Sequence, residues 1–208
     1  MAVVKGAFIR YDNDQPVVVV FQFNPESISR TPAHQPLESA TPTLENPRIT
    51  PSEPAESMRF DLQIDATDQL AAGSPLAAAH GILPILSALE LLMIPTERPN
   101  LQAMSGDNAY ASPPRSVPLV LFFWGTYRIL PVRITNLGID ETRFDTRLNP
   151  VRAKVSVSLD VLTPNRLGDN VFGKGVYDYT RGVKQVMAAL NTLNALETGA
   201  PASLSLNI

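Results

Sequence analysis

Residues 58–66 read Met-Arg-Phe-Asp-Leu-Gln-Ile-Asp-Ala, so apolar side chains occupy every second position and polar ones lie between them. Successive side chains of a β-strand point to opposite faces, and this pattern therefore predicts a half-buried strand with one wet face. Residues 151–161 repeat the alternation, with valine, alanine and leucine on one side and charged or hydroxyl groups on the other. These two stretches place the chain in the mainly β class, with an antiparallel sheet.

Four further runs of β-branched and aromatic residues predict strands at 3–10, 16–23, 117–124 and 127–139. The polar residues 11–15 favour a turn, so the first two runs are expected to form a hairpin. About six antiparallel strands of this kind close, or nearly close, into a β-barrel. Its predicted core includes Phe21, Phe23, Phe60, Leu62, Phe122, Trp124, Val155 and Val157.

Two stretches with apolar residues at helical spacing predict helices, so the class is α+β with a dominant sheet. The first is an internal amphipathic helix over about 76–94, with a kink at Pro84. The second covers about 181–197, with Thr180 as its N-cap. Residues 164–179 are rich in glycine, asparagine and aspartate and are expected to connect the sheet to this second helix.

The chain is expected to have two parts, a barrel domain over 1–163 and a C-terminal extension over 164–208. Residues 25–54 contain seven prolines, no glycine and no aromatic residue, which predicts an extended arm on the surface. Spaced apolar side chains in the arm and on the C-terminal helix are the candidate interface residues: Leu37, Leu44, Ile49, Val186, Leu190 and Leu193.

Composition excludes several classes of protein. Among the 208 residues there is no cysteine and there are only two histidines, so disulfides, thiolate metal sites and all-histidine metal sites are ruled out. The net charge of −3 offers no general attraction to nucleic acid. The N-terminus lacks the apolar segment of a signal peptide, and the longest apolar stretch, 82–94, is too short to cross a bilayer.

Residues 168–175, Gly-Asp-Asn-Val-Phe-Gly-Lys-Gly, match a phosphate-binding loop through Lys174. Gly175 then stands where serine or threonine would bind magnesium. The segment also follows an antiparallel strand and has no βαβ unit around it. A connector is the favoured interpretation, and nucleotide binding is the alternative.

Six side chains are of the types that hydrolysis by a nucleophile or by paired carboxylates uses: His34, Ser74, His80, Asp61, Asp65 and Asp68. The sequence around Ser74 lacks a nucleophile elbow, and the carboxylates lie largely on the polar face of one strand. We predict no catalytic, cofactor or metal site, and the chain is not expected to be an enzyme. A small monomeric domain that binds carbohydrate through Trp124 is a further alternative.

Three motifs in a fixed order carry a family resemblance: Phe21-Gln22-Phe23-Asn24-Pro25-Glu26, the strand at 58–62, and Phe122-Phe123-Trp124-Gly125. Together with the alternating strand that ends at Leu162, they make residues 3–163 resemble the contractile injection system tube-protein family. The resemblance implies a tail-tube-like barrel whose copies form a ring, hexameric in the family, in the baseplate of a phage-tail-like particle.

That resemblance further implies a structural role in which the ring joins the spike or hub to the inner tube. The implied partners are copies of the chain itself, the spike or hub protein, inner tube proteins and other baseplate proteins, with no nucleic acid and no membrane insertion. Assembly would take place in the bacterial cytoplasm, with release alongside the particle. The extension at 164–208 is too short and too helical for the LysM module common in the family, so a tube-end layer or a phage tail tube-layer protein is an alternative.

Overall fold

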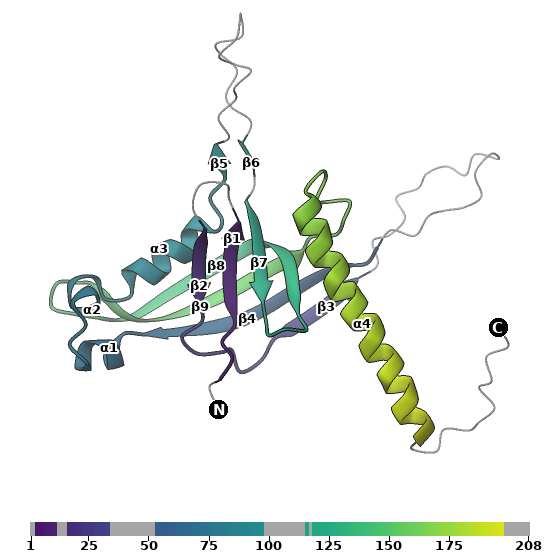
Figure 1. Cartoon of the computed structure of the whole chain (residues 1–208). Coiled ribbons are helices and arrows are strands. Elements are labelled where there is room, and N and C mark those ends of the chain that lie inside the picture. Colours follow the sequence, from purple (N-terminus) through teal and green to yellow (C-terminus); the bar gives the residue numbers. More distant parts are fainter. Residues whose placement is uncertain (1–2, 12–15, 34–52, 98–114, 117, 198–208) are drawn as a thin grey trace, which may run out of the picture.

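A single antiparallel sheet of seven strands dominates the computed structural model, which describes residues 3–11, 16–33, 53–97, 115–116 and 118–197. The strand order is β2-β1-β7-β8-β9-β4-β3, and a separate two-stranded ladder pairs β5 with β6 (Figure 1). The strands are β1 (Ala7–Tyr11), β2 (Val17–Val20), β3 (Ser29–Ala33), β4 (Ala55–Asp65), β5 (Thr96–Glu97), β6 (Arg115–Ser116), β7 (Leu119–Phe123), β8 (Ile129–Phe144) and β9 (Pro150–Val161). The helices are α1 (Thr67–Ala71), α2 (Pro75–His80), α3 (Leu83–Leu91) and α4 (Val171–Glu197).

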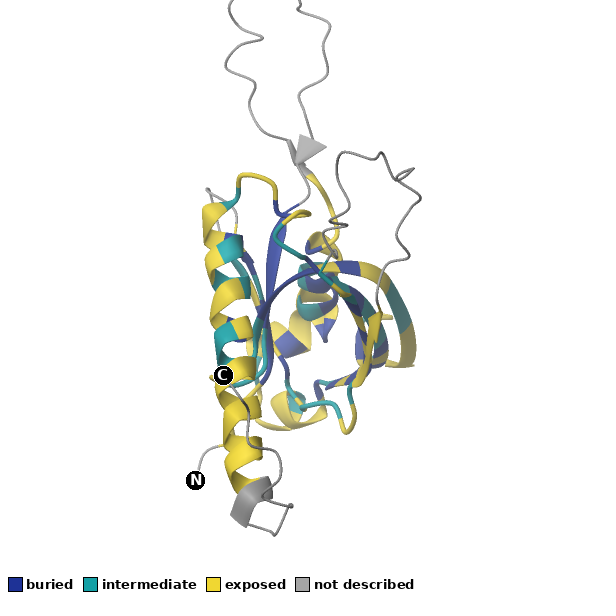
Figure 2. Cartoon of the chain, turned by 90° about the vertical axis from the view of Figure 1, so that its right-hand side faces the viewer, coloured by how far each residue is buried: buried dark blue, intermediate teal, exposed yellow. Residues whose placement is uncertain are grey.

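The six predicted strands are confirmed as β1, β2, β4, β7, β8 and β9. The alternation in β4 is realised residue by residue, because its side chains are buried and exposed in turn along almost the whole strand. Strand β9 lies antiparallel to it, with Phe60 opposite Val157 and Leu62 opposite Val155, so the two apolar faces coincide. The sheet curls around these buried side chains (Figure 2).

Four phenylalanines form the centre of the core. Phe60 stacks on Phe122 with ring centroids 5.5 Å apart, and Phe8 lies 6.1 Å from Phe60 and 5.2 Å from Phe21. Of the predicted core residues, Phe21, Phe60, Leu62, Phe122, Val155 and Val157 are buried, whereas Trp124 is half-buried and packs against the cluster. These rings come from β1, β7 and β4 and from the residue that follows β2, so their packing holds the sheet in its curled shape.

Phe23 was expected in the core, but its side chain is 45% exposed. Strand β2 ends at Val20, and the backbone bends at Gln22 and Phe23. This bend interrupts the two-residue alternation that would have put Phe23 on the same side as Phe21. The Phe23 ring instead lies beside the Lys5 ammonium, 5.8 Å from the ring centroid.

The single internal helix predicted over 76–94 is wrong, because that region folds into α2 and α3, with α1 before them. The chain turns at Gly81, whose φ of 57° favours glycine, and a Cβ there would lie 2.0 Å from the Pro150 carbonyl oxygen. Pro84 lies in the first turn of α3, where its missing N–H has no cost. Arg10 at the end of β1 donates to the Leu91 carbonyl at the far end of that helix.

Helix α4 begins at Val171, so the predictions of a connector through Gly175 and of an N-cap at Thr180 are wrong. Asn170 is the residue that caps the helix, because its Oδ1 accepts a hydrogen bond from the Gly173 N–H at 2.8 Å. A Cβ on Gly173 would lie 2.8 Å from Leu167, so the glycine permits close contact between helix and chain. Tertiary packing thus overrides the low helix propensity of the glycines.

The proline-rich arm contributes one short edge strand, β3, which pairs with β4 and places Pro32 opposite Glu56. Proline is tolerated in an edge strand because only one side of the strand needs a hydrogen-bonding partner. The predicted contact residues Leu37, Leu44 and Ile49 lie outside the described residues.

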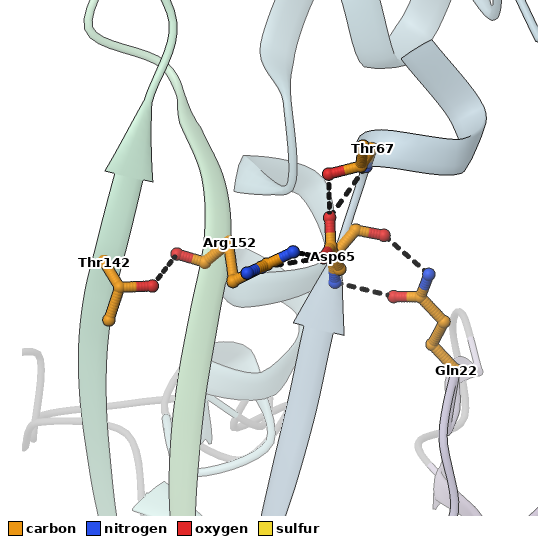
Figure 3. Close-up of polar contacts among 5 residues, drawn as sticks. All are labelled: Gln22, Asp65, Thr67, Thr142 and Arg152. Carbon is orange, nitrogen blue, oxygen red and sulfur yellow. Dashed lines mark hydrogen bonds and ion pairs between the residues drawn. The ribbon is translucent and has the colours of Figure 1, made fainter. Parts of the chain in front are cut away.

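Strands β2 and β3 are the two edges of the sheet, which is therefore open, and no backbone ladder joins them in the part of the chain that the structure describes. The side chain of Gln22 bridges the gap where β3 does not extend along β4. Its Oε1 accepts from the Asp65 N–H at 2.8 Å, and its Nε2 donates to the Asp65 carbonyl at 2.6 Å (Figure 3). One side-chain amide thus makes the two hydrogen bonds of a β-bridge.

The end of β4 is held from the other side as well. Arg152 donates from Nε to the Asp65 carboxylate at 2.7 Å, and the Thr67 N–H donates to the same group at 2.8 Å. Hydrogen bonds from Thr67 and the ion pair with Arg152 lower the pKa of Asp65. We call Gln22, Asp65, Thr67 and Arg152 the seam cluster, because it links the β2 segment, β4, α1 and β9.

We predict that Phe60→Ala lowers the free energy of unfolding by about 3–5 kcal/mol, because it empties the centre of the aromatic core. The matched variant Phe23→Ala removes an equal volume from an exposed position and is expected to cost less than about 1 kcal/mol. Urea unfolding followed by circular dichroism measures both values. Similar losses in the two variants would contradict the described core.

We also predict that Gln22→Ala destabilises the protein by about 1–3 kcal/mol, because the Asp65 N–H and carbonyl both lose their partner. Gln63→Ala is the control. Gln63 is exposed on β4, the strand that contains Asp65, and its loss is expected to change stability by less than about 0.5 kcal/mol. Hydrogen exchange at the Asp65 amide gives a local readout, which should speed up in Gln22→Ala alone. Unchanged exchange would show that the bridge does not protect the seam.

Candidate interaction surface

The N-terminal half of α4 packs on the outer face of the sheet. Gly173 and Thr180 are buried there, and the Tyr11 and Phe172 rings lie 4.8 Å apart. A second apolar cluster lies beneath the helix and consists of Leu119, Leu121, Leu162 and Leu167, with Ile9, Val176 and Tyr177 against it. The predicted C-terminal extension is therefore joined to the sheet by apolar contacts.

Thr180 joins the middle of α4 to the first residue of β8. Its Oγ1 donates to the Ile129 carbonyl and accepts from the Ile129 N–H at 3.4 Å. The Tyr179 hydroxyl donates to the Thr126 carbonyl at 2.9 Å in the turn before β8. These contacts use backbone groups at a strand end, which would otherwise need other partners.

A cluster of charged side chains, which we call the joint, fixes α4 where it leaves the sheet. Glu56 is 8% exposed and binds both Lys184, at 3.2 Å, and Arg30, at 2.6 Å. Arg181 binds Glu53 at 2.8 Å. Buried carboxylates are stable only when they are paired in this way, so the joint specifies where the helix lies.

Two further groups at the joint respond to its charges. Burial, followed by the positive charge of Arg30, lowers the pKa of Arg128. Burial and then the neighbouring Glu53 carboxylate raise the pKa of Tyr177 to about 12. Tyr177 therefore stays neutral well above the ordinary titration range of tyrosine.

The C-terminal half of α4 extends past the sheet and makes a separate surface (Figures 1 and 2). Every described side chain from Lys184 to Asn194 is exposed. Four large apolar side chains of this half face one side of the helix, with exposed fractions of 57% for Val186, 43% for Met187, 52% for Leu190 and 58% for Leu193. We call these four residues the α4 stripe.

The α4 stripe contains three of the predicted interface residues, Val186, Leu190 and Leu193, and the structure brings them together on one exposed face. Their contact role stays a prediction. The joint was missed, because its partners Glu56 and Lys184 are 128 positions apart and neither stands in a motif. The sequence shows charged residues, Arg181 and Lys184, on the helix just before the stripe, but it does not indicate which residues they bind.

The carboxylates considered for catalysis have structural partners. Asp61 binds Lys154 at 2.8 Å and accepts a hydrogen bond from Ser156 at 2.9 Å, and these two contacts lower its pKa. Asp65 belongs to the seam cluster, and Asp68 lies in the first turn of α1. The positions of Asp61 and Asp65 are those of ion pairs on a wet sheet face.

The remaining candidates lie at helix ends. Ser74 caps α2, accepting from the Ala77 N–H at 3.4 Å, and His80 lies exposed in the last turn of the same helix. His34 is outside the described residues. Among the residues that the structure describes, no three histidine or acidic side chains gather into a metal-binding group.

Two backbone N–H groups of the glycine-rich segment at 168–175, those of Gly173 and Lys174, are hydrogen-bonded at the start of α4. Asn170 takes the Gly173 N–H through its side chain, and its carbonyl accepts from the Lys174 N–H at 3.1 Å. A phosphate cradle needs such N–H groups free.

No described helix combines the length and the apolar character needed to cross a membrane.

No family model matches the chain, and no curated protein matches it either. The function is therefore inferred from the residues and their geometry.

We predict that the stability of the protein falls between about pH 10 and about pH 12 through Tyr177. The folded protein holds this proton to higher pH than the unfolded chain, whose tyrosines titrate near pH 10, so rising pH favours unfolding in that window. Tyr177→Phe should flatten the fall. Urea unfolding at several pH values measures it, with the exposed Tyr127→Phe as the control that keeps the wild-type dependence. Equal slopes in all three proteins would contradict the assignment.

Proposed function

We propose that this chain is a structural, ring-forming component of a contractile injection particle, which joins the spike or hub to the inner tube at the baseplate. The observation that carries the proposal is the α4 stripe, because an exposed row of large apolar side chains on a projecting helix is typical of a protein contact surface. The curled antiparallel sheet supports a tail-tube-like barrel, with the Gln22 bridge at its seam.

The motifs that resemble the tube-protein family have architectural roles in this fold. Gln22 bridges the seam, and Asn24 ties down the N-terminal segment by accepting from the Gly6 N–H and donating to the Val4 carbonyl, each at 2.9 Å. The backbone N–H of Trp124 donates to the Arg128 carbonyl at 2.8 Å across the turn at Gly125, whose φ is 72°. The resemblance therefore concerns residues that build the barrel-like shape.

A ring of identical barrels needs two different surfaces on each copy, because each neighbour is approached head to tail. The exposed edges at β2 and β3 lie on opposite sides of the strand order and are suited to this use. By family resemblance the ring has six copies, and its further partners are the spike or hub, the inner tube and other baseplate proteins. A tube-end layer or a phage tail tube-layer protein would use the same surfaces.

We predict that the full chain forms rings, and that a variant ending at Lys184 keeps its fold but loses most of this assembly. The truncation removes the α4 stripe and retains the joint. A chain ending at Glu197 is the control and should assemble normally. Light scattering after size-exclusion chromatography, with negative-stain electron microscopy, measures ring formation, and circular dichroism measures the fold.

A full chain that stays monomeric at every concentration, alone and when co-expressed with spike and tube proteins of a contractile injection particle, would overturn the proposal. The alternative function, nucleotide binding through residues 168–175, leads to a different expected result. It requires thermal stabilisation by magnesium and ATP that is lost in Lys174→Ala, and the proposal expects no such stabilisation.

A further inference from the structure

The apolar side chains of α4 follow a heptad repeat. Val176, Tyr179, Val183, Val186 and Leu190 are separated by three, four, three and four residues, and Leu193 follows after three more. This spacing is typical of the contact face of a helix that packs against other helices. Val176 lies at the edge of the contact with the sheet and packs on the second apolar cluster, whereas the next position, Tyr179, is 49% exposed, and the row continues from there onto the projecting half.

Between Lys184 and Glu197 the projecting half carries no charge on any face. Residues 185–196 include no aspartate, glutamate, lysine or arginine, although 18% of the chain is charged. A charged partner surface would find nothing complementary there. When identical segments meet, each charge faces its own copy, so an uncharged segment is suited to contact with itself.

The α4 stripe is also wider than the seam of a two-stranded coiled coil. Met187 follows Val186 directly and lies beside the heptad positions, and Ala188 and Ala189 come next. An apolar face that adds a third position per heptad is typical of helices with more than one helical neighbour. Small alanines allow such neighbours to approach closely.

We propose that the projecting half of α4, residues 183–197, packs in parallel against the same segment of neighbouring copies and forms a helical bundle. The inference rests on the proposed ring. Copies in a ring are related by rotation about one axis, so helices that approach this axis all run in the same direction along it. The occupant of the α4 stripe is thus a second copy of the stripe.

The size of the contact indicates that the bundle acts together with other contacts of the ring. Fourteen residues of helix, 184–197, span about 20 Å. The four side chains of the stripe bury far less than the about 800 Å² per partner of a standard stable interface. The bundle is therefore expected to form in the assembled ring rather than to hold isolated pairs of copies.

The experiment uses the absence of cysteine in the natural chain, so a single introduced thiol is unique. Leu190→Cys in the full chain is treated with a short bis-maleimide, which tethers two thiols only within about one helix diameter, roughly 10 Å. A parallel bundle brings the thiols of neighbouring copies together, and we expect most of the protein to run as a covalent dimer on a denaturing gel. Gln185→Cys lies about 140° round the helix and is the control, which should give few dimers.

Light scattering on the same samples separates this inference from the proposed function. Rings that give no Leu190→Cys dimer above the control would overturn the bundle and leave the ring intact. A chain that stays monomeric without dimers would overturn both. Efficient and selective cross-linking in a particle that is only a dimer would support pairing of the stripes and overturn the ring.

A charge placed in the α4 stripe gives a second readout. Leu190→Glu sets like charges against each other in a parallel bundle, so we expect the ring to dissociate at a protein concentration at least tenfold higher than for the wild type. Gln185→Glu adds the same charge on the other side of the helix and should leave dissociation unchanged. Equal effects of the two substitutions would contradict a specific contact through the α4 stripe.

Discussion

The two hydrogen bonds between the Gln22 side chain and the Asp65 backbone join the open edges of the curled sheet. An open sheet has unpaired N–H and carbonyl groups at both edges, and a side-chain amide can pair with them because it offers one donor and one acceptor. The same residue, Asp65, receives Arg152 and Thr67 through its carboxylate. The segment after β2, strands β4 and β9 and the start of α1 thus meet at one strand end.

Helix α4 divides into two halves with different physical chemistry. The first half is held by an apolar cluster, by Thr180 and by the paired charges of the joint, which are costly to separate once buried. The second half has no charges between Lys184 and Glu197 and presents the α4 stripe to its surroundings. A rigid attachment that aims an apolar row outward is suited to contact between copies, and this is the physical basis of both proposals.

The charged groups on the wet face of β4 and β9 form matched pairs along the strands. Asp65 lies opposite Arg152, and Asp61 binds Lys154 diagonally, so each of these carboxylates has a cation on the adjoining strand. Cross-strand pairs of opposite charge favour one register over its neighbours. These groups therefore specify how the sheet is assembled, and the proposed function depends on the surfaces at its edges and on α4.

The sequence by itself determined the strand class, most of the strands and most of the core, because alternation of apolar residues in β4 and β9 is a local signal with a period of two. It also singled out Val186, Leu190 and Leu193 as apolar positions of the C-terminal helix, and these are three of the four residues of the α4 stripe. Only the tertiary structure decided where helices begin and end: close packing at Gly173 extends α4 back to Val171, and the contact of Gly81 with Pro150 divides the internal helix. The seam cluster and the joint were equally beyond local patterns, since they join residues as far apart as Glu56 and Lys184, and such pairs exist only once the chain has folded.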